Sequence, residues 1–234
     1  MDPEAYKILD NPVWHALQTA HKGFALGTGT IKKYPADILP IFGCEDPAAA
    51  KLSKIEPWVA INEKLFIVGA LPPVPANWKL EAKLDCVQMI CPDGIQAKFE
   101  HKAEIVLLTE KDSQQMLELI EMVQPGYFYK STPILGQYYG IKKDKQLVAM
   151  AGERLRITGF TEVSAVCTHP AHTGKGYAQQ LVAHITTKNI EDEALPFLHV
   201  LTSNTRARKI YQLLGYSERK LVPFWRLTLN KYAG

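Results

Sequence analysis

Residues 161–178 read Thr-Glu-Val-Ser-Ala-Val-Cys-Thr-His-Pro-Ala-His-Thr-Gly-Lys-Gly-Tyr-Ala, and the interpretation of the chain starts from this stretch. A β-branched run leads into a glycine-bearing turn, and the turn leads into residues that favour a helix. This order directs several backbone N–H groups and the positive end of a helix dipole to one place. The stretch therefore predicts a binding site for a phosphate or pyrophosphate group.

Two common nucleotide-binding motifs do not fit this stretch. A P-loop needs a glycine five residues before its Gly-Lys pair and a Ser or Thr after the lysine, but His169 and Gly176 occupy these positions. The dinucleotide fingerprint needs a further glycine upstream at a fixed distance, which the sequence does not provide. The predicted anion is therefore part of a different ligand.

The composition is that of a globular protein with a sizeable core. The 234 residues are 47% hydrophobic and 22% charged, and the net charge of +3 is too small to indicate a nucleic-acid partner. No apolar run approaches the ~18 residues of a membrane span, and the acidic start at residues 1–4 is unlike a signal peptide. We therefore expect a cytoplasmic protein that binds neither nucleic acid nor membrane.

The cysteine pattern does not favour a metal site or a disulfide framework. Cys86 and Cys91 are five positions apart, without a second cysteine pair or a His-x-x-x-His nearby. Buried free thiols are the favoured interpretation for these two and for Cys44 and Cys167, and no metal is expected.

The hydrophobic pattern changes near residue 102 and predicts two domains, residues 1–101 and 102–234. The first is rich in proline, with a helix predicted after Asn11 and strands at 58–61, 65–68 and 80–91. The second is regular, and its order of elements predicts an α/β protein with a mixed (α+β) central sheet and helices on both faces. Its strands are expected at 103–108, 136–141, 146–154, 161–168, 197–201 and 224–229, and its helices at 113–123, 175–190 and 204–214.

Two segments in this second part resemble the GNAT N-acetyltransferase superfamily. Thr173-Gly174-Lys175-Gly176-Tyr177-Ala178 is similar to its acetyl-CoA motif, Arg/Gln-x-x-Gly-x-Gly/Ala, with Thr173 in place of the first Arg or Gln. Residues 204–216 are similar to its later helix, Asn-x-x-Ala-x-x-(apolar)-Tyr-x-x-x-Gly-(Phe/Tyr). The segments at 147–153 and 196–200 also resemble larger acyltransferases related to glycine N-acyltransferase. In that branch the N-terminal half is often a degenerate copy of the GNAT fold.

The resemblance implies that acetyl-CoA is the co-substrate and that its acetyl group passes to an amine by direct attack. A lysine-type amine has a pKa near 10.4, so presenting it neutral at pH 7 costs roughly 4–5 kcal/mol, and a base offsets part of this cost. Glu162, near the start of the strand before the cofactor loop, is the candidate base, alone or through water. Strand alternation predicts that it shares a face with Ser164, Val166 and Thr168. The alternative is a solvated carboxylate.

Tyr211 is the candidate general acid toward the CoA sulfur, and core packing is the alternative for this residue. His199 is a candidate proton relay or a hydrogen-bonded core histidine. Asn204 is expected to cap its helix and, by the resemblance, to contact the cofactor. The other residues that the resemblance assigns to acetyl-CoA binding are Val166, Cys167, Thr168, Thr173, Gly174, Lys175, Gly176, Tyr177 and Ala178.

The acceptor cannot be read from the sequence beyond a small-molecule or peptide amine, and the oligomeric state is also left open. Another acyl-CoA donor or an amino-acid acceptor fits the same motifs, as does a CoA-binding regulator without catalysis. Residues 127–129, Tyr-Phe-Tyr, suggest an aromatic wall of the acceptor site or an anchor of this loop to the other domain.

Overall fold

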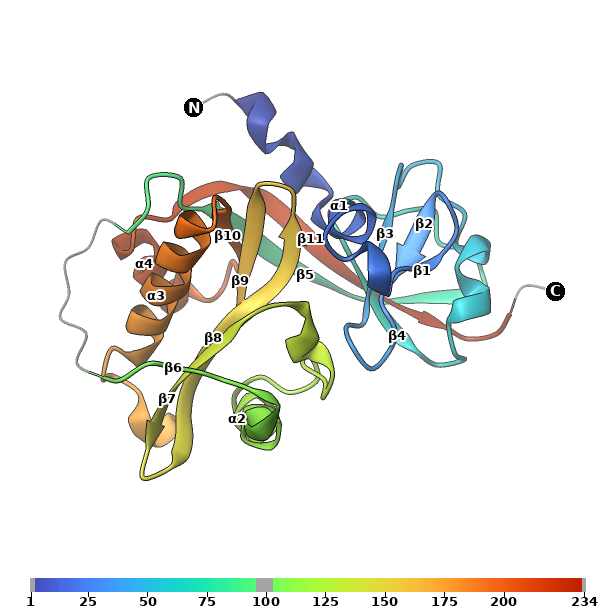
Figure 1. Cartoon of the computed structure of the whole chain (residues 1–234). Coiled ribbons are helices and arrows are strands. Elements are labelled where there is room, and N and C mark those ends of the chain that lie inside the picture. Colours follow the sequence, from blue (N-terminus) through green and yellow to red (C-terminus); the bar gives the residue numbers. More distant parts are fainter. Residues whose placement is uncertain (1–2, 96–102, 233–234) are drawn as a thin grey trace. The chain divides into compact units, whose positions relative to one another are not determined.

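The computed structural model describes residues 3–95 and 103–232, which form two compact units (Figure 1). One unit comprises Met1–Cys86 and Leu221–Gly234, and the other comprises Val87–Lys220. The predicted boundary near residue 102 falls outside the described residues. Two of the longest strands, β5 (Trp78–Ile90) and β11 (Ser217–Leu229), contribute residues to both units.

The strands belong to one mixed sheet with the order β1-β2-β3-β4-β11-β5-β10-β9-β8-β7-β6. The pairs β3·β4 and β9·β10 are parallel, whereas the hairpin pairs such as β7·β8 are antiparallel. This confirms the predicted mixed sheet and shows that the N-terminal strands also take part in it. The remaining strands are β1 (Leu26–Gly27), β2 (Ile31–Lys33), β3 (Ile41–Cys44), β4 (Lys64–Val68), β6 (Val106–Leu107), β7 (Tyr138–Lys143), β8 (Gln146–Ile157), β9 (Phe160–Thr168) and β10 (Leu195–Leu201).

In the first unit, helix α1 (Pro12–Gln18) begins after Asn11 as predicted, with proline in its first turn. The prediction of a strand at 58–61 is wrong, because Glu56–Trp58 forms a 3-10 turn. Pro57 lies in the first turn of this segment, where its fixed φ favours the turn. The strand predicted at 65–68 is confirmed as β4.

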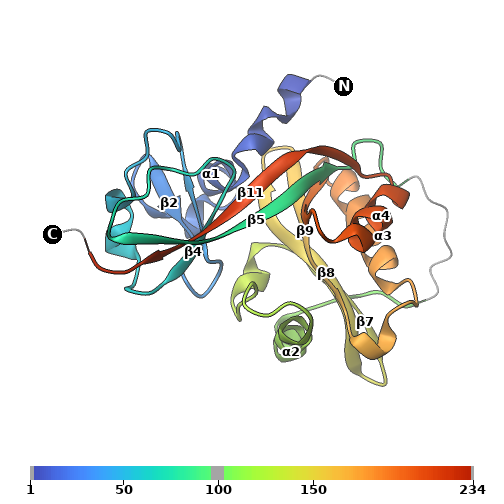
Figure 2. The ribbon, with the colours of Figure 1, turned by 180° about the vertical axis from the view of Figure 1, so that it is seen from behind.

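In the second unit, helices cover both faces of the sheet (Figure 1, and from behind in Figure 2). Helix α2 (Ser113–Val123) packs on one face, in a core that includes Met150 and Cys167. Helices α3 (Tyr177–Glu191) and α4 (Thr205–Leu213) pack on the other face with residues such as Val163. The apolar periodicity predicts all three helices, and their observed bounds differ from the predicted ones by two residues at most.

Strand β9 contains a bulge that changes which side chains share a face. Met150 pairs with Cys167 and Gly152 with Ser164, so two residues of β9 oppose one of β8, and Ala165 has a φ of 51°. Beyond the bulge Ala165 and Cys167 pack on the α2 face, and Val166 packs on the α3 face. The predicted common face of Glu162, Ser164, Val166 and Thr168 is therefore wrong beyond Ser164.

Strands β9 and β10 also separate in this region. Their parallel pairing runs from Leu195↔Phe160 to Phe197↔Glu162 and stops there, although the strands continue to Leu201 and Thr168. The pairing of β9 with β10 ends at Glu162, and the bulge at Ala165 lies three residues further along β9. Beyond Glu162, the edge of β9 that faces β10 is therefore not paired with it.

Candidate active site

Glu162 lies inside the second unit at the last paired position of β9 and β10. Its side chain is only 1% exposed, which excludes the solvated carboxylate considered from the sequence. Arg154 of β8 binds it with two hydrogen bonds, Nε to Oε2 at 2.9 Å and Nη2 to Oε1 at 2.5 Å. His199 of β10 contacts the same Oε1 through Nδ1 at 2.7 Å, and its side chain is 2% exposed. The carboxylate is thus held on two sides by nitrogen donors.

These contacts determine the charge of Glu162. Burial by itself raises the pKa of a carboxyl group, but the positive charge of Arg154 and the hydrogen bonds from His199 and Arg154 outweigh it. The pKa of Glu162 is lowered from 4.5 to about 2. The carboxylate stays ionised at neutral pH, and it is a weak proton acceptor by itself.

This lowered pKa gives the protein a stability component that depends on pH. The unfolded state binds a proton at Glu162 near pH 4.5, whereas the folded state resists protonation down to about pH 2. The stabilisation is therefore complete above pH 4.5 and is lost as the pH falls toward 2, by roughly 3 kcal/mol over the interval. Urea unfolding at several pH values should show the wild type losing this advantage over Glu162→Gln. A difference that does not vary with pH would contradict the lowered pKa.

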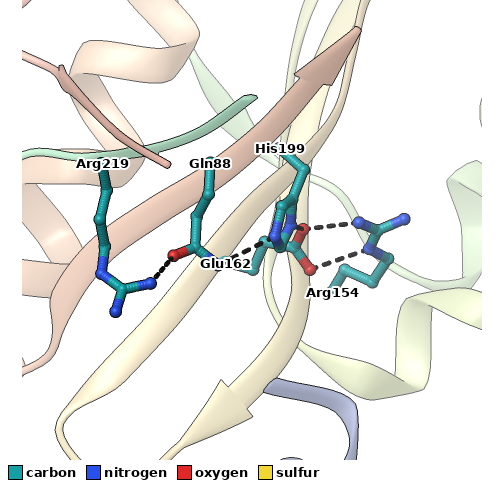
Figure 3. A network of polar contacts seen from close by, with 5 residues as sticks. All are labelled: Gln88, Arg154, Glu162, His199 and Arg219. Carbon is teal, nitrogen blue, oxygen red and sulfur yellow. Dashed lines mark hydrogen bonds and ion pairs between the residues drawn. The ribbon is translucent and has the colours of Figure 1, made fainter. Parts of the chain in front are cut away.

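The network continues from His199 to the neighbouring strands (Figure 3). Gln88 of β5 contacts His199 through its Nε2, 3.0 Å from the ring Nε2. Arg219 of β11 donates from Nη1 to Oε1 of Gln88 at 2.7 Å. Arg154, Gln88 and Arg219 were not predicted as site residues, because none of them lies in the two GNAT-like motifs and they are distant from one another in the sequence.

Tyr211 of α4 lies on the face of the sheet that α3 covers. Its side chain belongs to the buried cluster on the α3 side, with its ring 6.0 Å from that of Tyr216. Burial raises its pKa to about 12, so the hydroxyl remains protonated at neutral pH. Val163 packs in this same cluster, so by alternation Glu162 points to the opposite face. The two predicted catalytic residues are thus on opposite sides of the sheet.

The predicted cofactor loop follows β9 directly. A 3-10 turn, Pro170–His172, leads to Thr173, whose hydroxyl donates to the Pro170 carbonyl at 3.0 Å. Gly174 and Gly176 have φ values of 79° and 75°, which glycine adopts without strain. Gly176 is the N-cap of α3, and Tyr177 and Ala178 open this helix. The first N–H groups of a helix have no partner within it, so the turn suits an anion.

The loop carries basic side chains. Lys175 Nζ lies 3.3 Å from Nδ1 of His172; Lys175 is exposed and His172 is half-buried. The His169 ring accepts a hydrogen bond from the backbone N–H of Ala171 at 3.1 Å, which makes it a turn residue. The positive charge of Lys175 next to the start of α3 adds to the preference for an anion.

The edge of β9 leads from Glu162 to this loop through Val166, Cys167 and Thr168. Among the residues that the structure describes, the buried hydroxyl oxygen of Thr168 has no hydrogen-bond partner. Such a group is costly unless something pairs with it, so it fits a strand edge that receives a polar ligand. Cys167 is 4% exposed, and burial raises its pKa to about 12, so its thiol is no nucleophile.

Asn204 caps α4 as predicted, since its Oδ1 accepts from the N–H of Ala207 at 3.1 Å. The loop before β7 is anchored to its own unit, because Phe128 packs edge-on against Tyr138 with ring centroids 5.6 Å apart.

Within residues 3–95 and 103–232 there is no cluster of three His, Cys, Asp or Glu side chains arranged to hold a metal ion. Nor does any helix in that part have the length and hydrophobicity to cross a membrane.

Comparisons with known proteins found a matching family model and similar structures. The family model of FR47-like proteins matches residues 138–225, from β7 into β11. No curated protein sequence matches the chain. A structure from Novosphingobium aromaticivorans, assigned as an acetyltransferase of the GNAT family, has 28% identity and a TM-score of 0.86, and the match covers 95% of this chain and 99% of that one.

More distant structures share the fold. A GCN5-related N-acetyltransferase from Kribbella flavida has 16% identity and a TM-score of 0.61, with 94% of each chain covered. A GNAT-family acetyltransferase from Colwellia psychrerythraea has 12% identity and a TM-score of 0.53, with 70% of this chain and 64% of that one covered. Residues 138–225 are therefore similar to FR47-like proteins, and the chain has the fold of GNAT-family acetyltransferases.

Proposed function

We propose that the protein transfers an acetyl group from acetyl-CoA to a primary amine by direct attack of the amine on the thioester. The observation that carries this proposal is the end of β9·β10 pairing at Glu162, which leaves a strand edge that runs into an anion-binding turn. The pantetheine arm of acetyl-CoA has amide groups that can pair with such a strand edge. It is joined to a pyrophosphate that can bind to such a turn.

The residues of the edge and the turn have separate tasks in this proposal. The backbone of Val166, Cys167 and Thr168 pairs with the pantetheine amides, and the unpaired Thr168 hydroxyl supports a polar ligand there. The N–H groups of residues 174–178 hold the pyrophosphate, with Thr173 and Lys175 beside it. Asn204, whose side chain caps α4, contacts the pantetheine arm with its remaining polar atoms.

The chemistry requires a proton acceptor for the amine and support for the departing sulfur. As the new N–C bond forms, the amine proton passes to Nε2 of His199, and the negative charge of Glu162 next to Nδ1 stabilises the resulting imidazolium. Glu162 thus acts through His199, because its own pKa is lowered to about 2 and its side chain is buried.

The C–S bond breaks to release the CoA thiolate, whose pKa is near that of an ordinary thiol, about 8.5. The pKa of Tyr211 is raised to about 12, so full proton transfer from it to the thiolate is uphill. Tyr211 therefore acts as general acid chiefly by donating a hydrogen bond to the sulfur, and solvent completes the protonation. Acetyl-CoA supplies the activated acyl group for the whole reaction.

The cofactor site can be tested with a matched pair of glycine variants. Gly174 and Gly159 have nearly equal φ values, 79° and 77°, and no atom lies within 4 Å of an added Cβ at either position. Alanine therefore causes the same backbone strain at both, on the order of 1 kcal/mol. We expect Gly174→Ala to weaken acetyl-CoA binding at least tenfold and Gly159→Ala to leave it unchanged. Calorimetric titration measures both.

Equal acetyl-CoA affinity in the two variants would contradict the placement of the pyrophosphate. A thermal-shift comparison of CoA, acetyl-CoA and ATP with Mg²⁺ on the wild type gives an independent check. A ligand at 100 times its Kd adds about 2.7 kcal/mol of stability, and only the two CoA species should do so.

Which reaction the protein catalyses in detail depends on the acyl-CoA donor and on the acceptor. The resemblance to the glycine N-acyltransferase branch favours longer acyl-CoA donors and amino-acid acceptors as the second candidate. A panel of acyl-CoA donors against amines, peptides and amino acids, analysed by mass spectrometry, separates these outcomes. Tight acetyl-CoA binding without turnover across the panel would support the remaining alternative, a CoA-binding regulator without catalysis.

A further inference from the structure

In the five-residue network of Figure 3, the direction of each hydrogen bond follows from which atoms can donate. An arginine side chain only donates hydrogen bonds, so the Gln88 atom that faces Arg219 at 2.7 Å must be the amide oxygen. The amide nitrogen of Gln88 then faces His199 and donates to the ring Nε2 at 3.0 Å. Nε2 must therefore carry a lone pair and no proton.

The other side of the ring agrees with this assignment. Nδ1 of His199 lies 2.7 Å from Oε1 of Glu162, and an ionised carboxylate only accepts. Nδ1 must therefore carry the proton. Arg154 donates two hydrogen bonds to the Glu162 carboxylate, so an arginine donor lies at each end of the network. These two donors determine the tautomer of the His199 ring between them.

We propose that Gln88 and Arg219 are positioning residues that hold His199 as the neutral Nδ1–H tautomer, with its basic Nε2 ready for a proton. This inference rests on the proposed function, in which Nε2 accepts the proton of the attacking amine. Protonation of Nε2 while Gln88 is held would bring two donors together. Rotating the amide instead would turn its NH₂ group toward the donors of Arg219.

The consequence is a resting site in which the Nε2 lone pair accepts from the Gln88 amide, and the acceptor amine takes the place of this amide in the reaction. The charged and titratable groups around the ring come from several strands. They are Glu162 of β9, Arg154 of β8 and Arg219 of β11, and also Tyr138 of β7, whose pKa is raised by burial and by the nearby charges of Glu153 and Glu162. Arg219 is linked to the ring through its hydrogen bond to Gln88.

The tautomer can be measured without substrate. In ¹⁵N-labelled protein at neutral pH, the ring nitrogens of His199 differ in chemical shift according to whether they carry a proton. The chain has seven histidines, and the signals of His199 are assigned by their absence in His199→Asn. We expect the wild type to be protonated at Nδ1 only. A ring protonated at Nε2 only would overturn the proposal.

Two variants at position 219 test the role of the arginine. Arg219→Lys keeps a donor toward the Gln88 oxygen, whereas Arg219→Met removes it and frees the amide to rotate. We expect Arg219→Lys to resemble the wild type, and Arg219→Met to show an increased fraction of doubly protonated ring at the same pH. Identical spectra for the two variants would contradict the proposal.

Gln88→Glu gives a second, nearly isosteric test, because a carboxylate at this position accepts from Nε2 and favours the doubly protonated ring. We expect kcat to fall at least tenfold with the KM for acetyl-CoA unchanged. In Arg219→Met the acidic limb of the kcat/KM profile should move to higher pH, which a merely structural role would not produce. If the tautomer results hold but no amine is acetylated, the proposed function fails and the assignment of the network remains.

Discussion

Replacing Glu162 by glutamine is expected to lower kcat by about 10²–10⁴, the usual contribution of a positioned general base. The amide removes the negative charge that stabilises the His199 imidazolium, and its NH₂ group has to face a donor of Arg154 or the Nδ1–H of His199. The KM for acetyl-CoA should change little, because in the proposal the cofactor is held by residues 166–168 and 174–178 and not by Glu162. Steady-state kinetics with a saturating amine found by the acceptor panel measures the effect.

A matched control separates this chemistry from the loss of a buried charge. Glu153 on β8 is also buried, at 2% exposure, and its carboxylate accepts from the N–H of Gln137 at 2.9 Å. Glu153→Gln should therefore lower stability while kcat remains within a few-fold of the wild type. Equal kcat losses in the two variants would show that burial of a carboxylate, and not its contact with His199, explains the result for Glu162.

The second large effect is expected for stability, in Gly152→Ala. A Cβ at this position would lie 2.2–2.5 Å from three ring atoms of Tyr138, whose side chain is buried against Phe128. The ring has no room to move in a packed core, so we expect a loss of about 3 kcal/mol in the free energy of unfolding. Urea denaturation measures this loss.

Gly23→Ala is the control for this substitution, because no atom lies within 4 Å of its added Cβ and its φ is outside the strained region. Its stability should change by less than about 1 kcal/mol. Combining Gly152→Ala with Tyr138→Leu should cost less than the sum of the single changes, since the two side chains contend for one space. Simple additivity would indicate that the Tyr138 ring is not the obstacle.

The regular elements of the second unit were largely predictable. Met116, Leu119 and Ile120 repeat at helical spacing and are buried in α2, and Asn204 caps α4 as its residue type indicates. Strand β4 was recognised by its apolar run, but the strand predicted at 58–61 failed because Pro57 favours a turn. Secondary structure was thus predicted correctly where the conformational preference of a segment agrees with its packing in the fold.

The site was predictable only in part. Glu162 was selected through its place before the cofactor loop, yet nothing nearby in the sequence indicates that Arg154 and His199 hold it. Gln88 and Arg219 are 131 positions apart and meet only because β5 and β11 are neighbours in the sheet. The bulge at Ala165 was also missed, since an alternating strand pattern carries no signal for one extra residue.

The helices of the second unit and the glycine-bearing turn after β9 follow from the sequence alone, because helix periodicity, caps and glycine conformations depend on neighbours a few residues away. Only the tertiary structure decided the charge of Glu162, the tautomer of His199 and the point where β9 and β10 separate. Each of these depends on the distance between groups from different strands, and burial in a medium of low polarity makes such contacts strong. Contacts between distant segments are set by the topology of the sheet, which local patterns do not contain.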